Sequence, residues 1–289
     1  MLAICEPESR AQELEPLAYA HNPVGVNFFL IAYGSTWGDV LFDASSRLTD
    51  VNARWNSATL GYGRTFSLFG RSANFAVAAP YVWGQANGRL DGEAGEAPRS
   101  GFADPRIRFG INLLGGPALT FKEFSTVPPR TTLGATLVVA PPLGEYMNDK
   151  LINLGANRWS TKIELGLSHP AGNWRFEAAA GVWWFTDNDE FLIDSLQTQD
   201  PIVSYQAHVI YAFRRQFWVA LNGTWYRGGT SSIDGFASAT SLSNTRFGLT
   251  ASYPLGTWQS LKIAVNKGVT TRFGGDFRQY TIAWQYTWF

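Results

Sequence analysis

Hydrophobic and polar residues alternate along much of the chain, with a period of two residues. Between residues 106 and 113, four apolar side chains alternate with two arginines, a glycine and an asparagine. Residues 158–168, 203–211 and 246–253 follow the same pattern. Such alternation predicts β-strands with one apolar face, because successive side chains of a strand point to opposite sides.

About twelve such segments follow one another, each of roughly the ten residues that a tilted strand needs to cross a bilayer. They predict an all-β fold: a single antiparallel up-and-down transmembrane β-barrel over residues 23–289, after an N-terminal tail of residues 1–22. In the second segment, the alternation of residues 51–55 is out of phase with that of residues 58–62, which predicts a bulge between them. The expected strands are 24–33, 51–66, 74–87, 105–114, 131–141, 158–168, 173–186, 202–213, 216–227, 244–254, 260–269 and 278–288.

The connections between these segments alternate between short and long. Those at 67–71, 169–172, 214–215 and 255–258 are tight, whereas residues 88–104 and 187–201 are examples of long polar loops. Short turns at one end and long loops at the other are typical of outer-membrane barrels, with both termini on the periplasmic side.

Two connections do not follow directly from this rule. Residues 115–130 lie on the short-turn side yet are long, and residues 118–124 could form a brief helix there. Residues 144–157 either fold back and narrow the bore or form an exposed surface loop. The sequence leaves these two alternatives open.

Composition limits the classes of protein that fit. Charged residues make up 16% of the chain and aromatic residues 15%, while the mean hydropathy is −0.10 and no run of about 20 apolar residues occurs. The formal net charge of +0 argues against a nucleic-acid partner. A single cysteine and three widely spaced histidines predict neither a metal site nor a cofactor.

The N-terminal tail permits two interpretations. Residues 2–5 are apolar but are followed at once by acidic and basic residues, so residues 1–22 are either the remnant of a truncated signal peptide or a disordered cytosolic tail. The barrel pattern favours export and therefore the first interpretation.

The apolar faces are expected to contact lipid rather than fill the interior. Twelve strands enclose a bore wider than side chains can fill, since about eight already suffice for a packed interior. The apolar faces also begin or end in aromatic residues, where interfacial girdles lie. This predicts the outer membrane of a Gram-negative bacterium, with lipid, lipopolysaccharide and the barrel assembly machinery as partners. The aromatic residues are Trp159, Trp174, Trp184, Trp225, Tyr253, Tyr280, Trp284, Tyr286 and Trp288.

The polar faces are then expected to line the lumen. Basic residues outnumber acidic ones there, which predicts a mild preference for anions; alternatively, the charges pair across strands and only fill the space. Apolar residues on the same face predict either a patch for aromatic solutes or packing against a loop. The lumen-lining candidates are Arg106, Arg108, Arg158, Lys162, Glu164, Arg175, Glu177, His208, Arg246 and Lys262, and the apolar ones are Trp183, Phe185, Ile210, Trp218 and Tyr226.

Several longer runs resemble a known family of outer-membrane β-barrels, the "MetA-pathway of phenol degradation" family, whose members are described as transporters. The resemblance implies a barrel that exports or takes up small, perhaps aromatic, compounds, and it implies no catalytic residues. The runs that carry it are residues 22–28, 57–66, 103–106, 142–160 and 185–191.

Three functions fit these observations. The leading hypothesis is passive passage of small solutes through the lumen, without a cofactor. The second is a non-conducting scaffold or partner-binding barrel, plugged by loops or by residues 1–22. The third is an outer-membrane hydrolase, for which His208 is the one histidine well inside a strand, although Ser204 and Gln206 beside it make no triad. The carboxylates of residues 187–190 suggest a calcium loop, but without its spacing a solvated acidic loop fits better.

Overall fold

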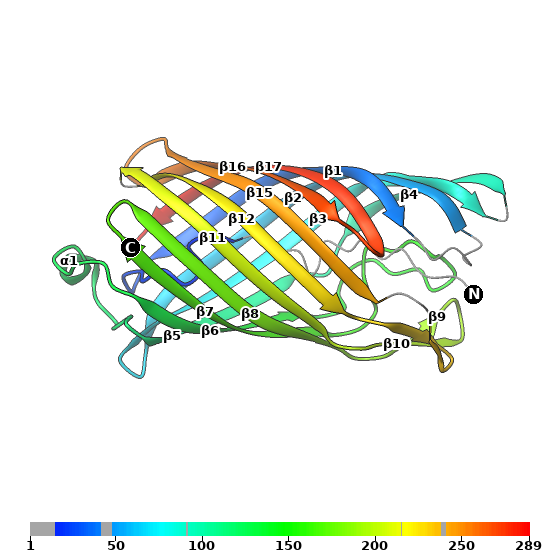
Figure 1. Cartoon of the computed structure of the whole chain (residues 1–289), viewed down its shortest axis with the longest axis horizontal. Coiled ribbons are helices and arrows are strands. Elements are labelled where there is room, and N and C mark those ends of the chain that lie inside the picture. The colour runs from blue at the N-terminus through cyan, green and yellow to red at the C-terminus, as the bar shows by residue number, and fades with distance from the viewer. Residues whose placement is uncertain (1–14, 42–47, 91, 215, 238–240) are drawn as a thin grey trace.

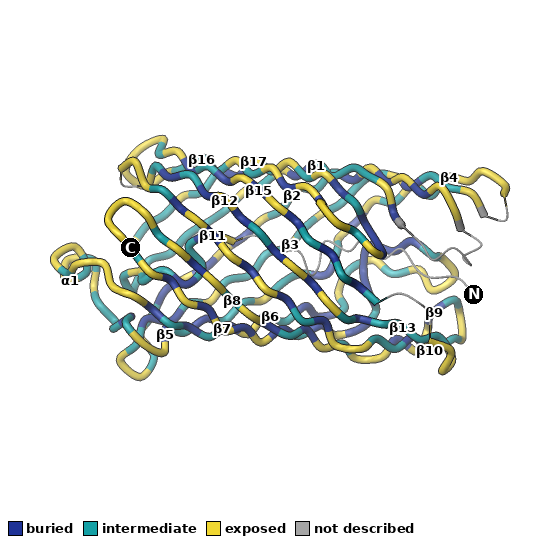
Figure 2. Tube along the Cα trace, in the orientation of Figure 1, coloured by how far each residue is buried: buried dark blue, intermediate teal, exposed yellow. Residues whose placement is uncertain are grey.

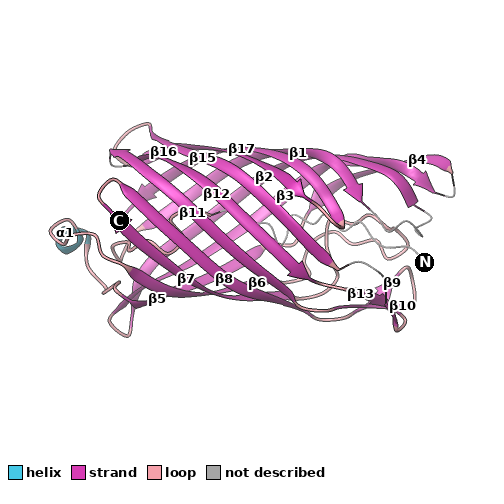
Figure 3. Ribbon diagram, in the orientation of Figure 1, coloured by secondary structure: helices cyan, strands magenta, loops and turns pink. Residues whose placement is uncertain are grey.

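The computed structural model describes residues 15–41, 48–90, 92–214, 216–237 and 241–289. Most of the described chain is β-strand (Figure 3). None of its helices is long and apolar enough to span a membrane. The expected signal-peptide remnant in the first residues lies outside the described part of the chain.

Twelve antiparallel strands close into a barrel (Figure 1). Each strand pairs with its neighbours in sequence, and the last strand pairs with the first from Asn27↔Trp288 to Leu41↔Gly274. The predicted fold is therefore confirmed, and each of the twelve predicted segments overlaps one barrel strand. These strands are β1 (Asn27–Leu41), β2 (Leu48–Leu68), β3 (Arg71–Leu90), β5 (Arg106–Leu114), β6 (Thr132–Ala140), β7 (Ser160–Ala171), β8 (Trp174–Phe185), β11 (Ile202–Arg214), β12 (Phe217–Gly228), β15 (Leu242–Pro254), β16 (Gln259–Thr270) and β17 (Gly274–Trp288).

The predicted bulge in the second strand is wrong. β2 pairs with β1 without interruption from Val51 to Arg64, and the register shift against β3 lies at its start, between Thr49 and Asn52. Val51, Ala53 and Trp55 point into the barrel, whereas Leu60 and Tyr62 point out of it. The apolar pattern changes phase because the interior is apolar at one end of this strand, not because the backbone shifts.

The region between β3 and β5 contains a strand where a long loop was predicted. β4 (Glu93–Phe102) forms a hairpin with the extended end of β3. β4 and β5 pair with successive parts of β3, and residues 103–105 separate them. The loops after β8 and β12 also contribute short strands, which form a separate four-stranded sheet. These are β9 (Asn188–Phe191), β10 (Ser195–Gln199), β13 (Ser231–Ile233) and β14 (Phe236–Ala237).

The two ends of the barrel differ as predicted. One end carries tight turns, such as Phe69 and Gly70, both with positive φ as a two-residue hairpin turn requires. The same end carries the long connection between β5 and β6, which contains the predicted short helix, α1 (Phe121–Phe124). The other end carries β4, the four-stranded sheet and the loop of residues 141–159, and we therefore assign it to the outside of the cell.

The outer wall is apolar and the inner wall polar, as Figure 2 shows by the alternation of exposed and buried residues along each strand. Ile163, Leu165 and Leu249 are each more than half exposed in the isolated chain, whereas Lys162, Glu164 and Arg246 are buried. Aromatic rings follow one another around the short-turn end, from Trp174 through Tyr211, Phe213 and Phe217 to Tyr253. Large apolar side chains facing outward in a closed barrel mean contact with lipid, so the chain is a membrane barrel of the outer-membrane kind.

Candidate functional site

The candidate site is the interior of the barrel. Nine of the ten charged or polar candidates predicted to line the lumen lie on inward-facing strand positions, as do the five apolar candidates, whereas Arg158 is buried in the loop just before β7. Arg158, Lys162, Glu164, Glu177, His208 and Arg246 are buried, and Arg106, Arg108, Arg175 and Lys262 are half-buried. Their neighbours in the chain, such as Ile107 and Ile163, are exposed on the outer wall.

A polar network centred on Glu164 lies at mid-height in the barrel. Lys162 Nζ lies 2.9 Å from Glu164 Oε2, and Gln206 Nε2 donates to the same oxygen at 2.9 Å. The Lys162 ammonium also lies 5.4 Å from the centre of the Trp183 ring, within the range of a cation–π contact. Removing one partner of such a buried ion pair costs about 3–5 kcal/mol, so these charges hold the interior together as well as making it polar.

His208 belongs to a second chain of hydrogen bonds across the wall. Its Nδ1 lies 2.9 Å from Asn222 Oδ1, and Asn222 Nδ2 donates to Thr250 Oγ1 at 2.9 Å. Ser204 Oγ, one of its neighbours along the strand, donates to the backbone oxygen of Gly181. The partner of the imidazole is thus an amide, which supplies neither the nucleophile nor the carboxylate of a hydrolytic triad.

The five apolar candidates do not form one patch. Trp183 and Tyr226, with Phe185 packed beside them, join a cluster that also contains Val138, Ile202, Leu242 and Phe273. Ile210 and Trp218 form a separate cluster with Ala220, nearer the short-turn end. The aromatic residues therefore line two different levels of the lumen.

The most informative feature of the interior is the segment of residues 15–22, which the sequence placed in a tail. This segment runs inside the barrel from the short-turn end (Figure 1). The backbone N–H of Leu17 donates to Glu177 Oε2 at 2.7 Å, and Thr132 Oγ1 donates to the backbone oxygen of Tyr19 at 2.6 Å. Glu15 forms an ion pair with Arg108. Hereafter we call residues 15–22 the internal segment.

The barrel wall is shaped to receive Tyr19. Its hydroxyl donates to Glu164 Oε1 at 2.6 Å. Burial, with the negative charge of Glu164, raises the pKa of Tyr19, so the phenol keeps its proton and remains a donor. Its ring lies on Gly134 and Gly166, which face each other on β6 and β7, and a Cβ at Gly166 would lie 2.1 Å from the ring. These two glycines provide the space that the ring occupies.

Leu17 fixes the other side of the internal segment. Its side chain packs on the cluster of Ile210, Trp218 and Ala220. Its φ of 70° is in the left-handed region, which a leucine rarely adopts unless its surroundings impose it. The contact to Glu177 and the apolar cluster together impose this conformation.

The connection between β5 and β6 is long rather than a tight turn because it has a role in packing. It contacts the end of the internal segment and the residues that lead into β1: His21 Nε2 lies 2.7 Å from the backbone oxygen of Pro117, and Val24 N–H donates to Leu119 at 2.8 Å. The connection therefore fastens the internal segment at the entrance to the barrel.

The loop between β6 and β7 folds back into the barrel, the first of its two predicted alternatives. Residues 152–156 are buried, whereas residues 147–150 are exposed. Asp104, in the interruption between β4 and β5, accepts hydrogen bonds from Gly144 N–H at 2.6 Å and from Ala156 N–H at 3.0 Å. One carboxylate thus fastens both ends of the loop.

The acidic residues 187–190 contribute to this packing. Asn188 is buried and donates to Tyr146 Oη at 2.9 Å, while Asn157 Nδ2 donates to Glu190 Oε2 at 3.1 Å. Within the described residues, no group of three or more His, Cys, Asp or Glu could hold a metal ion.

Three of the cavities that the described residues line lie at different levels of the barrel. One of about 1010 Å³ opens at the short-turn end between Phe28, Trp218 and Trp258. One of about 440 Å³ lies at the other end, against β2, β3 and β4. The cavity between them, beside Tyr19 and Glu164, measures about 10 Å³, room for about one water molecule. The internal segment therefore occupies the lumen at mid-height.

Sequence reasoning named residues 1–22 as a plug only in its second hypothesis, and it missed the two glycines that receive the internal segment. A usable signal was present, because the apolar run of residues 17–20 lies between two prolines and is too short to form a strand. Gly134 and Gly166 also occupy inward positions of strands that otherwise carry larger side chains. The sequence does not show that Gly134 and Gly166 pair across β6 and β7, so it could not be inferred that both make space for one side chain.

Comparison with solved structures supports the fold. The chain superposes on the crystal structure of an outer membrane channel from Pseudomonas putida F1 with a TM-score of 0.79 and 21% identity, covering 96% of this chain and 100% of that one. It also resembles the transport unit of the autotransporter AIDA-I from Escherichia coli, with a TM-score of 0.53 and 8% identity over 96% and 94% of the two chains. These likenesses show that the chain has the fold of a closed β-barrel.

Comparison of sequences gives the family. No curated protein matches the chain. The family model "MetA-pathway of phenol degradation" matches residues 40–282, most of the barrel. The chain therefore belongs to this family.

Proposed function

We propose that this protein is an outer-membrane channel for passive passage of small solutes, aromatic or hydrophobic ones among them, which the internal segment closes in the present conformation. The observation that carries the proposal is a charged inner wall with a large cavity at each end and a single narrow level between them. Outer-membrane lipid, lipopolysaccharide and the barrel assembly machinery are the partners that we expect for such a barrel.

The polar lining supports a hydrated path. Trp183 Nε1 and Thr224 Oγ1 are buried, and within the described residues they have no hydrogen-bond partner. Leaving a buried donor unsatisfied costs about 1–3 kcal/mol, so water or a solute is the expected partner. A barrel that only served as a scaffold would gain from replacing these groups with apolar ones.

The nature of the obstruction also supports a channel. The internal segment is not a strand of the barrel. Within the described residues, side-chain hydrogen bonds and one ion pair hold it to the wall, including a hydrogen bond from Ser72 Oγ to the backbone oxygen of Asn22 at 2.9 Å. It can therefore leave the lumen without breaking the hydrogen bonds between strands, and the pore then widens at the level of Tyr19.

A second candidate function, a non-conducting barrel, is favoured by the same closure of the lumen. The two candidates differ in whether the internal segment leaves its place under working conditions. Conductance in a planar bilayer separates them, because a scaffold gives no single-channel events and no solute flux into liposomes.

The charge of the lumen provides the sharper test. Reversing Arg106 and Arg108 to Glu places negative charge beside the narrow level, so the reversal potential in a salt gradient is expected to move toward cation selectivity. The matched control reverses Arg89 and Lys267, which are exposed on the outer face of the wall, and should leave the reversal potential unchanged. Channel events with the same selectivity in both double variants would contradict the assignment of the lumen as the path.

A further inference from the structure

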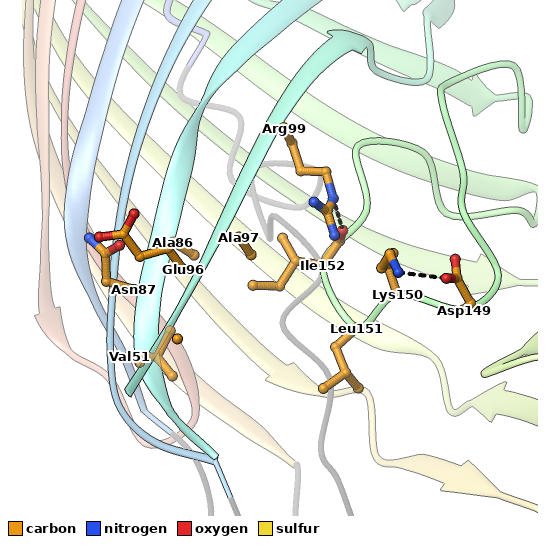
Figure 4. Close-up of a pocket in the computed structure, with 12 residues that line it drawn as sticks. Val51, Ala86, Asn87, Glu96, Ala97, Arg99, Asp149, Lys150, Leu151 and Ile152 are labelled. Carbon is orange, nitrogen blue, oxygen red and sulfur yellow. Dashed lines mark hydrogen bonds and ion pairs between the residues drawn. The ribbon is translucent and has the colours of Figure 1, made fainter. Parts of the chain in front are cut away.

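The cavity at the extracellular end is separate from the closed level of the lumen. Its wall is built by the extended ends of β2, β3 and β4 on one side and by the returning loop on the other (Figure 4). These strand ends project beyond Phe102, Tyr81 and Trp83, whose rings contact one another on the outer wall. If these rings mark the membrane surface, as aromatic girdles do, the cavity lies just outside the bilayer.

The inner surface of this cavity is apolar and spacious. Val51 and Ala86 of the strands and Ile152 of the loop belong to one buried cluster, which also includes Trp55 and Phe277. Ala97 and Leu151 pack against this cluster and line the cavity with it. Gly95 lies on the same face of β4, and a Cβ there would meet no heavy atom within 4 Å. A volume of about 440 Å³ falls in the range of pockets that hold small organic molecules.

Three of the four charged side chains that line the cavity lie along its loop side. Arg99, Lys150 and Asp149 gather there, with Lys150 Nζ 2.5 Å from Asp149 Oδ2 (Figure 4). Glu96 and Asn87, in contrast, lie on the far side of the two strands, away from the loop. On the loop side of the cavity, the charges of Lys150 and Asp149 cancel in their ion pair. The guanidinium of Arg99 therefore gives this side a net charge of one positive unit.

Arg99 can bind a ligand while holding the loop. Its Nε donates to the backbone oxygen of Ile152 at 2.8 Å and its Nη1 to that of Pro98 at 2.6 Å. Within the described residues its Nη2 has no hydrogen-bond partner. A guanidinium carries five N–H donors and prefers carboxylates among planar acceptors.

We propose that this cavity binds a small organic anion with an apolar body, a monocarboxylate with one aromatic ring, before the solute enters the lumen. The ring would occupy the space beside Gly95 and Ala97, and the carboxylate would accept hydrogen bonds from Arg99. This inference rests on the proposed channel function for its purpose, although binding itself needs no open pore.

Equilibrium dialysis of the whole folded chain in detergent against radiolabelled 3-phenylpropanoate tests the proposal. We expect saturable binding to the wild-type chain, and a dissociation constant raised at least about tenfold by Gly95→Leu, which fills the cavity. Ala94→Leu is the matched control, because Ala94 is the exposed neighbour of Gly95 on β4 and faces away from the cavity. Heat-modifiable migration on a gel confirms that each variant is a folded barrel.

The charge of the ligand is tested separately. Arg99→Gln keeps an amide donor for the loop but removes the positive charge, so 3-phenylpropanoate should bind about fivefold more weakly while 3-phenylpropanol is unaffected. Absence of saturable binding, or equal binding by the Gly95→Leu and Ala94→Leu variants, would overturn the proposal. The channel function fails in a different way: no conductance from any variant, with the binding pattern intact.

Discussion

At the scale of single residues, the contact between Tyr19 and the barrel wall shows how a side chain can close a lumen. The ring fits where β6 and β7 carry glycine, and the hydroxyl reaches a carboxylate that is already part of an ion pair. Each partner alone is ordinary. Their alignment gives the internal segment one preferred place.

This contact predicts the effect of Gly166→Val. The added side chain occupies the position of the Tyr19 ring, so the internal segment loses its place and the open probability of single channels is expected to rise at least about tenfold, the equivalent of about 1.4 kcal/mol. Gly223→Val is the control, since Gly223 lies on the outer face and a Cβ there meets only the Phe247 side chain at 3.3 Å. An open probability equal in both variants would argue against closure by Tyr19.

His21 provides a pH-dependent contact at the entrance. Burial lowers the pKa of His21, because the protonated ring is poorly solvated between Phe124 and the backbone of Pro117. When the internal segment is out of the barrel, the His21 ring binds a proton below its ordinary pKa of about 6.5. When the segment is in place, the ring binds a proton only at lower pH. The stabilisation from His21 is therefore complete above about pH 6.5 and is lost as the pH falls.

An NMR titration of the His21 ring checks this prediction. We expect a pKa below the ordinary value of about 6.5 in the folded barrel and a return to that value in urea. A folded-state pKa at or above the value in urea would mean that the ring is not buried against the connection between β5 and β6.

At the scale of elements, the twelve strands could be predicted from the alternation of side chains, because lipid outside and polar groups inside impose the same period on every strand. The rule failed where that contrast is absent. β4 mixes charged, small and apolar residues on both faces, since it projects beyond the membrane. The apolar inner residues of β2 likewise led to the wrong prediction of a bulge. They are apolar because they pack against a loop, and the position of that loop cannot be read from the local sequence pattern.

The candidate site was predictable only in part. The faces of Lys162 and Glu164 followed directly from strand periodicity. The contacts between inward-facing side chains could not be predicted in this way. The hydrogen bond from Tyr19 to Glu164, for example, joins residues that are 145 positions apart in the sequence. The apolar candidates likewise form two clusters because their strands place them at different levels along the barrel axis, which the sequence pattern does not give.

Asp104 gives a prediction at this scale. Asp104→Ala removes the acceptors of Gly144 and Ala156, which is expected to weaken the attachment of the loop by about 2 kcal/mol. Trypsin should then cleave after the exposed Lys150 about ten- to thirtyfold faster, as that free energy implies. Asp187→Ala, which removes an exposed carboxylate from the next extracellular loop, is the control; cleavage no faster in Asp104→Ala than in the control would contradict this role.

At the scale of the whole molecule, the barrel combines a wall that lipid and the strand hydrogen bonds hold rigid with an internal segment that a few contacts hold in place. The wide cavities on either side are then the two ends of one path, interrupted at a single level. A pair of cysteines can lock that level without altering the wall, because Leu17 packs on the cluster that contains Ala220.

The most direct measurement is the single-channel conductance of the variant Leu17→Cys/Ala220→Cys, with Cys5→Ser to remove the native thiol and with disulfide formation verified by mass. Our account predicts no channel events in the oxidised protein and events of wild-type size after a reducing agent is added to the same bilayer. The same conductance in both states would show that solutes do not pass where the internal segment lies, and would contradict the account.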